Sequence, residues 1–568
     1  MATAPAAVAD RPGSTRTALV ALLAPSSPAL GDEVERELQS IPGLSVGLLS
    51  TAQGNYTQAS LFADIGHASR VASVAGRLSV VSLPAGREGC SRLRTLMRER
   101  RAGELVLVLE RASGPHAHEL RWAAIAGAAN RGDTTLSSQT TREHGLIAAV
   151  DVVPTVLAYL RLPIPTSIHG RSIHSDGRLD GDWLRRLRAR LETIYPRRLP
   201  ALVCLLGAWA LLLALAATPL PRSSRAARVK RALRIGALAL LWTPLAALPP
   251  AAIEPSAAGE YALIVATAFA LGALTDALLP WPRGPIVPAV SAVVALSFDA
   301  LAGTQLLMRS LLGPNPAYGS RFYGIGNELK PALAVLVFAA VAAALYGARR
   351  SRRGAVAMAG AGVLLAVVEG SALIGAGVGG VVLVSAGTAV AIVLLLPGSL
   401  QRARLLAIVL APIVGLALLA ALDLATAKGA GHFTGSVLQA HSLGDLQDLM
   451  TGRYRAAWHE LGNGLMPMAT AAAVLIVPAG VRYRERVLAP VAFDPAWQAA
   501  FAGGLSAGVV GALIEDSGPV LLLVAVFALA CVLGYLWGAP QPNAATTTAS
   551  EHSRGTVPAL SPQHDLVL

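Results

Sequence analysis

From about residue 200 to residue 538, the sequence is a succession of apolar runs of roughly 20 residues, each long enough to cross the hydrocarbon core of a bilayer about 30 Å thick. Lipid offers the backbone no hydrogen-bond partners, so such runs must fold as helices. Hydrophobic residues make up 54% of the chain and charged residues only 14%, which agrees with a large share of the chain lying in lipid. The sequence therefore predicts an all-α polytopic membrane domain over residues 200–538, with the lipid bilayer as its partner.

About eleven membrane-spanning helices fit this region. Their expected positions are near residues 200–220, 233–252, 259–279, 286–307, 330–348, 354–371, 377–397, 403–423, 464–481, 498–515 and 519–538.

Basic residues concentrate in every second loop between these spans, above all in residues 222–234 and 349–353. Because cytoplasmic loops carry an excess of Lys and Arg, this asymmetry predicts a multi-pass plasma-membrane protein with these loops and the C-terminal tail in the cytoplasm. The same asymmetry accounts for the net charge of +13, so no nucleic-acid partner is expected. The N-terminal region is then extracytoplasmic. Two features oppose this orientation: residues 183–198 hold six arginines on the predicted outer side, and residues 1–17 do not resemble an export leader.

Residues 17–180 have a different pattern, in which short apolar runs alternate with helical segments. Strands are expected at 17–24, 44–50, 78–83 and 104–110, with helices at 32–40 and 92–101 between them. This alternation predicts an α/β domain with a mainly parallel sheet. Residues 1–16 and 539–568 are predicted to be disordered, and residues 181–199 to form a basic connector that ends at Pro196.

The stretch 145–173 carries the clearest motif of this domain. Asp151 opens a predicted helix from Val152 to Leu160, and a Leu-Pro-Ile-Pro turn and the tripeptide Gly170-Arg171-Ser172 follow. This layout resembles the C-terminal signature of the alkaline phosphatase superfamily, which implies that fold for residues 17–180. The stretches 47–70 and 136–151 resemble a subgroup of uncharacterised bacterial membrane proteins in which such a domain precedes a polytopic region. Within them Arg142 is of interest, because a guanidinium can bind a phosphate through two hydrogen bonds.

The resemblance to the superfamily implies two divalent metals bound by Asp and His. The first expected ligand is an Asp after the first strand, but residues 23–27 read Leu-Ala-Pro-Ser-Ser. The Asp-His pair expected after a central strand is also missing behind residues 104–110. The domain is therefore predicted to be a degenerate member without metal or cofactor. The alternative is that four loop histidines gather around one metal: His116, His118, His144 and His169.

Three glycine-rich segments fall on the predicted outer side of the membrane domain, at 319–328, 369–380 and 515–519. Charged residues at membrane depth mark a cavity or a pathway, and glycines allow irregular backbone to line it. We hypothesise that these segments converge on a substrate site. Its members are Arg321, Asn327, Glu328, Glu369, Glu515 and Asp516. The first and last segments also resemble the same membrane subgroup.

A long outer loop, residues 424–463, contains the string Thr-Gly-Arg453-Tyr-Arg455-Ala-Ala-Trp. It resembles the Gly-Arg-x-x-x-Trp element of O-antigen ligases, in which arginines hold a lipid-linked pyrophosphate. Arg453 and Arg455 are therefore further candidates for substrate binding.

Two functions follow from these patterns. In the first, the chain is a cell-envelope membrane protein that handles an anionic or lipid-linked substrate at its outer face, by transport or by transfer. In the second, the N-terminal domain is an active metal-dependent phosphatase or phosphotransferase that the spans anchor. The first explains why there are far more spans than an anchor needs.

Overall fold

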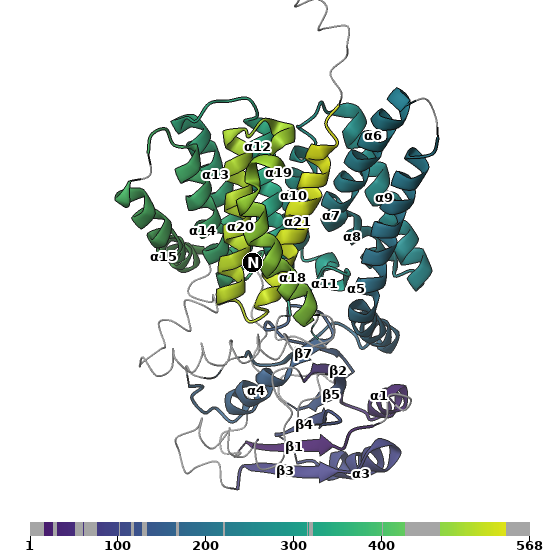
Figure 1. Cartoon of the computed structure of the whole chain (residues 1–568). Helices are drawn as coiled ribbons and strands as arrows, with labels where there is room; N and C mark the ends of the chain where they lie inside the picture. The colour runs from purple at the N-terminus through teal and green to yellow at the C-terminus, as the bar shows by residue number, and fades with distance from the viewer. Residues whose placement is uncertain are drawn as a thin grey trace, which may run out of the picture.

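The computed structural model describes residues 16–26, 31–51, 61, 76–101, 103–114, 119–127, 133–165, 168, 170–219, 222–314, 316, 322–399, 401–426 and 466–540. These residues form an N-terminal α/β domain and a helical part, with the domain lying against one end of the helices (Figure 1). The predictions of disorder for residues 1–16 and 539–568 concern segments that, apart from Arg16 and residues 539–540, lie outside the described residues.

The α/β domain is built on a mixed eight-stranded sheet with the order β3-β1-β4-β5-β2-β6-β8, and β7 also pairs with β2. The pairings give six strands one direction, while β5 and β8 run against them. The expected strands at 17–24, 44–50, 78–83 and 104–110 are present within one residue. The strands are β1 (Thr17–Leu23), β2 (Ser45–Ser50), β3 (Leu78–Leu83), β4 (Glu104–Glu110), β5 (Leu120–Ala126), β6 (Thr135–Ser137), β7 (Leu146–Ala148) and β8 (His174–Asp176).

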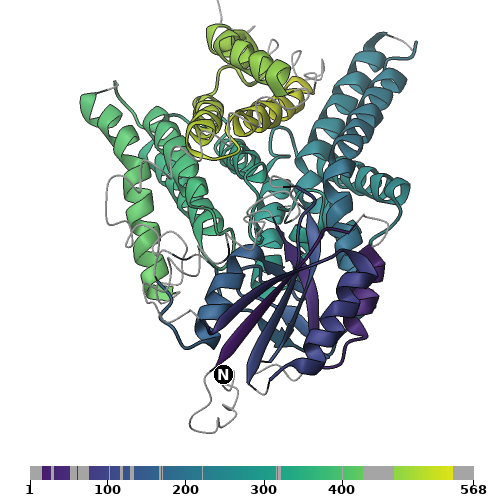
Figure 2. The ribbon, with the colours of Figure 1, turned by 90° about the horizontal axis from the view of Figure 1, so that it is seen from below.

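Both faces of the sheet are covered by helices. Val20 and Leu22 of β1 belong to an apolar cluster with α4 (Val152–Tyr159), while Leu19 and Ala21 belong to a second cluster on the other face. That second face is covered by α1 (Gly31–Gln39), α3 (Gly86–Glu99) and the start of α5 (Gly181–Ala216). Neighbouring residues of β1 alternate between the two clusters because successive side chains of a strand point to opposite faces of the sheet. Figure 2 shows the resulting layers from below.

The predicted helix after Asp151 is α4, which follows a short 3₁₀ turn, η3 (Ala149–Asp151). The Asp151 carboxylate is fully buried and accepts hydrogen bonds from Thr140 Oγ1 at 2.5 Å, the Arg171 amide at 2.9 Å and the Ala148 amide at 3.0 Å. At Gly170 the φ angle is +105°, and a Cβ there would lie 2.3 Å from the carbonyl oxygen of Val150. The Asp151 carboxylate thus connects Arg171, near the end of the domain, to Thr140 and to Ala148 of the sheet, and we call these three hydrogen bonds the clasp.

Within the described residues, seven helices are long and apolar enough to span a membrane, and a pair of helices bent by 55° raises the number to eight if it counts as one span. These seven are α5, α9 (Ala257–Leu278), α13 (Arg352–Gly370), α14 (Val378–Leu395), α15 (Arg402–Thr426), α20 (Pro495–Ile514) and α21 (Pro519–Trp537). The bent pair comprises α6 (Arg222–Leu241) with α7 (Thr243–Ala246) and α8 (Leu248–Ile253).

Helices lie at every predicted span position, but three of them are shorter than a full crossing. They are α10 (Ile286–Ala302), α12 (Leu329–Ala344) and α18 (Met466–Arg482). The chain is therefore a membrane protein with several spans, and the number of eleven stays a prediction. The remaining helical turns are α11 (Leu306–Arg309), α19 (Arg484–Val487) and η4 (Ala489–Val491).

The segment interpreted from sequence as a connector is the first half of α5, a single helix of 36 residues that continues into the first span. Pro196 and Pro200 lie inside this helix and do not end it. Arg190, on the turns before Pro196, binds the buried Glu260 of α9 through two hydrogen bonds of 2.6 and 3.0 Å. Arg197 binds the same carboxylate at 2.8 Å, so two of the six arginines of this segment share one acid as their partner.

The domain rests on residues 299–328 of the helical part. The Ser50 hydroxyl, at the end of β2, donates to the Pro316 carbonyl at 2.6 Å. The Arg142 guanidinium lies over the Tyr323 ring at 4.0 Å, and the Gln305 amide donates to the Arg142 carbonyl at 2.9 Å. These contacts connect the domain to the loop that leads into α12.

Candidate functional site

The three glycine-rich segments meet at the domain end of α12, α13, α14 and α20. The Ile325 amide donates to the Gly375 carbonyl at 3.1 Å, which joins the first segment to the second. Gly324, with φ +82°, allows this approach, because a Cβ there would lie 2.4 Å from the same carbonyl oxygen. The Asn327 side-chain amide donates to Asp516 Oδ1 at 2.5 Å and to the Ser517 hydroxyl at 3.2 Å, which joins the first segment to the third.

Lys330 lies at the centre of this arrangement and is completely buried. Its ammonium donates to Glu515 Oε1 at 2.5 Å and to Asn327 Oδ1 at 2.8 Å. A buried ammonium in an apolar bundle is expensive unless it is paired, and Glu515, also buried, supplies the opposite charge. We name Asn327, Lys330, Glu369, Glu515 and Asp516 the polar cluster.

The N-terminus of α14 forms the wall behind this cluster, and its glycines make room for the acids. A Cβ at Gly379 would lie 2.1 Å from Glu515 Oε1, and one at Gly380 would lie 2.6 Å from Glu369 Oε2. The same Cβ at Gly380 would lie 3.3 Å from Cδ of Lys330. Glu369 is fully buried, and it lies against the same two glycines as Lys330 and Glu515. The positive end of the α14 dipole faces these carboxylates.

The structure thus brings together Asn327, Glu369, Glu515 and Asp516 of the hypothesised site. Glu328 lies beside them but is nearly half exposed, and it faces Arg198 of α5 at 3.7 Å. Arg321, Arg453 and Arg455 lie outside the described residues. Lys330 was not among the candidates from sequence, because a lone lysine before an apolar run also fits a loop residue at a membrane boundary.

A second polar cluster lies at the carboxyl ends of β1 and β4, where the superfamily resemblance implies metal ligands. Here the Arg121 guanidinium is buried between two acids, at 3.3 Å from Glu110 Oε1 and 2.7 Å (Nε) from Glu119 Oε2. The Ser26 backbone carbonyl accepts from the same guanidinium at 2.9 Å. Burial raises the pKa of Glu119, but the hydrogen bonds from Ser113 and the positive charge of Arg121 outweigh this effect and hold the pKa below its usual value. The two acids at this edge thus share one protein cation, Arg121, as their partner.

Among the described residues, no group of three or more His, Cys, Asp and Glu side chains is arranged to hold a metal ion. Of the four histidines that could gather around a metal, His116, His118 and His169 lie outside the described part of the chain. His144 Nδ1 lies 3.4 Å from the Ser137 hydroxyl.

Glu143 lies buried where the domain meets α10 and α11, next to the stacked Arg142. Burial raises the pKa of Glu143 to about 7; the charge of Arg309 opposes this shift and that of Asp299 adds to it. Asp299 itself caps α11 by accepting from the Leu306 and Leu307 amides at 2.8 and 2.9 Å. A titratable carboxyl therefore lies inside the contact between the two parts.

We expect the stability of this contact to depend on pH. The folded state binds the Glu143 proton more tightly than the unfolded chain does, so stability is greatest below about pH 4.5 and is lost as pH rises through about 7. The expected loss is on the order of 1–3 kcal/mol, and a Glu143→Gln variant should lack it. Thermal unfolding of both proteins at about pH 5 and about pH 8 measures the difference. Identical pH profiles for the two proteins would show that Glu143 does not cause the pH dependence.

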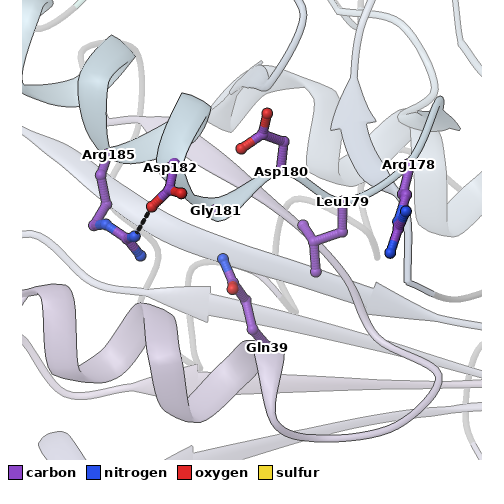
Figure 3. Close-up of a pocket in the computed structure, with 7 residues that line it drawn as sticks. All are labelled: Gln39, Arg178, Leu179, Asp180, Gly181, Asp182 and Arg185. Atoms are coloured by element: carbon purple, nitrogen blue, oxygen red, sulfur yellow. Dashed lines mark hydrogen bonds and ion pairs between the residues drawn. The ribbon is translucent and has the colours of Figure 1, made fainter.

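A shallow pocket lies elsewhere, between the C-terminal end of α1 and the start of α5 (Figure 3). It is lined by Gln39, Arg178, Leu179, Asp180, Gly181, Asp182 and Arg185. Arg185 is already bound to Asp182 and, at 2.7 Å, to Glu35, and Asp180 caps α5. Arg185 joins α5 to α1, and Asp180 and Asp182 bind groups of α5 itself, so we place the candidate site at the polar cluster instead.

Comparisons of the chain with protein-family models, with curated proteins and with solved structures give no match.

Proposed function

We propose that this chain is an integral plasma-membrane protein of the bacterial cell envelope that handles an anionic or lipid-linked substrate at the polar cluster, by transport or by transfer. The α/β domain, an alkaline-phosphatase-like domain that works without metal, covers the site from the outside. The observation that carries the proposal is the buried Lys330, held at the meeting point of three glycine-rich segments. Its ammonium is a group that a phosphate or carboxylate can bind in exchange for Glu515.

The glycines support the same function. Gly324, Gly379 and Gly380 keep the space around the cluster free of side chains, so backbone and acids lie against each other without any Cβ between them. Irregular backbone at membrane depth is tolerated where it lines a cavity or is buried in protein. The arginines at 321, 453 and 455, on the same predicted side, would add the positive charge that attracts an anion.

The lipids and glycans that co-purify with the full chain test this proposal. We expect anionic, lipid-linked species in the wild-type preparation. Their amount should fall at least tenfold in Lys330→Met, which corresponds to a loss of about 1.4 kcal/mol of binding free energy. The matched control is Glu328→Gln, a nearby exposed acid outside the cluster. Equal amounts of the same species in all three proteins, each inserted at normal levels, would disprove the proposed site.

The orientation is a separate prediction. Arginine-rich loops 222–234 and 349–353 are expected in the cytoplasm, which leaves the α/β domain and loop 313–329 outside. Single cysteines at Ser320 and Ser351, introduced into a chain whose own three cysteines are replaced, report this with a membrane-impermeant thiol reagent. In intact cells Ser320→Cys should be labelled and Ser351→Cys should not; the opposite pattern would reverse the assignment.

The second candidate, a metal-dependent phosphatase anchored by the spans, predicts a different result. It requires tightly bound zinc or manganese in the purified chain and hydrolysis of aryl phosphates that a chelator abolishes. We expect no such turnover, because Glu110 and Glu119 at the edge of the sheet are already bound to the Arg121 guanidinium. Two metals per chain together with chelator-sensitive hydrolysis would establish the phosphatase.

A further inference from the structure

A strongly basic turn joins α18 to α19, on the side of the helical part that faces away from the α/β domain (Figure 1). Three arginines lie there in alternate positions: Arg482, Arg484 and Arg486. All three are exposed, and none forms an ion pair with another residue that the structure describes. The guanidinium carbons of Arg482 and Arg486 each lie 5.6 Å from the centre of the Tyr483 ring, which is half exposed. We name residues 482–486 the basic turn.

A second aromatic side chain lies beside the basic turn. Trp537, at the end of α21, donates its indole N–H to the carbonyl of Val487 at 3.1 Å. Its side chain is half exposed, as that of Tyr483 is. Trp and Tyr are enriched where the hydrocarbon core of a membrane meets the lipid headgroups, because each has an apolar ring and a polar group. The two side chains therefore indicate that the basic turn lies at the depth of the headgroups.

The helix before the turn presents an apolar surface that leads up to it. α18 packs against α21, and its outward side chains include Leu475, which is 72% exposed, and the half-exposed Ile476 and Val481. In the membrane-spanning part of a protein, such side chains contact acyl chains. Along α18 and the basic turn the surface thus changes from apolar to aromatic and basic, which is the order of acyl chain, interface and phosphate in a lipid layer.

α6 brings a further basic group to the end of α21. Arg234 donates to the Gly538 carbonyl at 2.7 Å and also binds Asp276. Lys230 lies one turn earlier on α6, and its carbonyl oxygen would be 2.8 Å from a Cβ at Gly538. The Lys230 side chain is partly exposed and forms no ion pair within the described part of the chain. Basic groups of α6 and of the basic turn, far apart in sequence, thus lie at one helix end.

We propose that the basic turn binds the phosphate of an anionic phospholipid, whose acyl chains lie along the exposed side of α18. A guanidinium can hold a phosphate through two hydrogen bonds, and the Tyr483 ring positions Arg482 and Arg486 beside each other. Lys230 adds a point charge from α6. A water-soluble anion would match the basic turn but not the apolar surface below it. This lipid site lies at the other end of the helices from the polar cluster, so it is independent of the function proposed above.

Native mass spectrometry of the full chain in detergent, with lipid added, tests the site. Phosphatidylglycerol should bind at least about tenfold more tightly than phosphatidylcholine, which carries no net charge. Each basic residue near a membrane surface contributes about fivefold to the affinity for anionic lipid. The triple variant Arg482→Gln, Arg484→Gln, Arg486→Gln should therefore bind phosphatidylglycerol on the order of a hundredfold more weakly and phosphatidylcholine as before. Equal affinity of the wild type for the two lipids would overturn the proposal.

A matched control removes the same number of charges from the loop that leads into α13. Its arginines are exposed and form no ion pair with the described residues. The control variant Arg349→Gln, Arg350→Gln, Arg352→Gln should lose no more than about fivefold in affinity for phosphatidylglycerol. Equal losses in the two triple variants would show a general attraction of lipid to basic loops and overturn the site. Glycerol 3-phosphate, which has no acyl chain, should not displace the lipid; displacement at equal concentration would make a free phosphate the ligand and overturn the lipid.

A measurement on the unaltered chain does not depend on how the variants fold. The full chain is placed in phosphatidylcholine nanodiscs that contain a trace of photoreactive phosphatidylglycerol, with its reactive group next to the glycerol. Mass spectrometry of the labelled peptides should show more label on residues 475–486 than the equivalent phosphatidylcholine probe leaves there. Equal labelling of this segment by the two probes would overturn the site, whatever the variants show.

Discussion

Replacement of Glu260 by alanine is expected to lower the free energy of unfolding of the full chain by about 3–5 kcal/mol. Arg190 is almost completely buried, and both of its terminal nitrogens bind this carboxylate. Arg197 binds it as well. Without Glu260 the buried Arg190 guanidinium keeps its charge, because arginine does not deprotonate, and it forms no other ion pair with the described residues.

Chemical denaturation in lipid nanodiscs measures this effect. The matched control is Glu88→Ala, which breaks an exposed pair with Arg92 and should cost no more than about 1 kcal/mol. The double variant Arg190→Met, Glu260→Leu should regain most of the loss, since it removes the buried charges together. A cost for Glu260→Ala as small as that of the control would show that the pair does not hold α5 to α9.

Replacement of Asp151 by alanine should unfold or severely destabilise the α/β domain, at a cost of about 3–9 kcal/mol. The change leaves two backbone amides and the Thr140 hydroxyl without their acceptor in the domain interior, and each buried unsatisfied group costs about 1–3 kcal/mol. Burial raises the pKa of Asp151, although the bonds to its carboxylate oppose the shift.

Hydrogen exchange of the full chain locates this loss. Amides of β7 and of residues 170–173 should exchange first, because they are the segments that the carboxylate joins. Asp151→Asn, which keeps one acceptor oxygen, should have an intermediate effect. Protection of both segments at wild-type levels in Asp151→Ala would contradict the role of the clasp.

Sequence patterns predicted the elements that have a recognisable apolar pattern within their own residues. The run at 104–110 has five consecutive apolar residues and is β4, and the run at 78–83 is apolar except for two serines and is β3. The strand β5 was not predicted, because Arg121 interrupts its apolar run. In the fold that arginine is buried among Glu110 and Glu119, an arrangement that no local pattern contains. The strands β6, β7 and β8 have three residues each, too few to show a period.

The candidate site was predictable in its location but not in its chemistry. Glycines beside acids at three span ends indicated where irregular backbone would gather. The central cation was missed, because Lys330 and Glu515 are 185 positions apart in the chain. From sequence, Lys330 is one of several basic residues near loops; only the packing of α12 against α20 makes it the partner of a buried acid.

The continuity of α5 has a mechanical consequence. With 36 residues the helix is about 54 Å long, so it reaches from the α/β domain through the first span. Its first turns are fastened to α1 through Arg185 and Glu35, and its middle to α9 through Glu260. Because the helix is continuous, we expect a tilt of the domain to move its opposite end, which leads to α6 at Arg222.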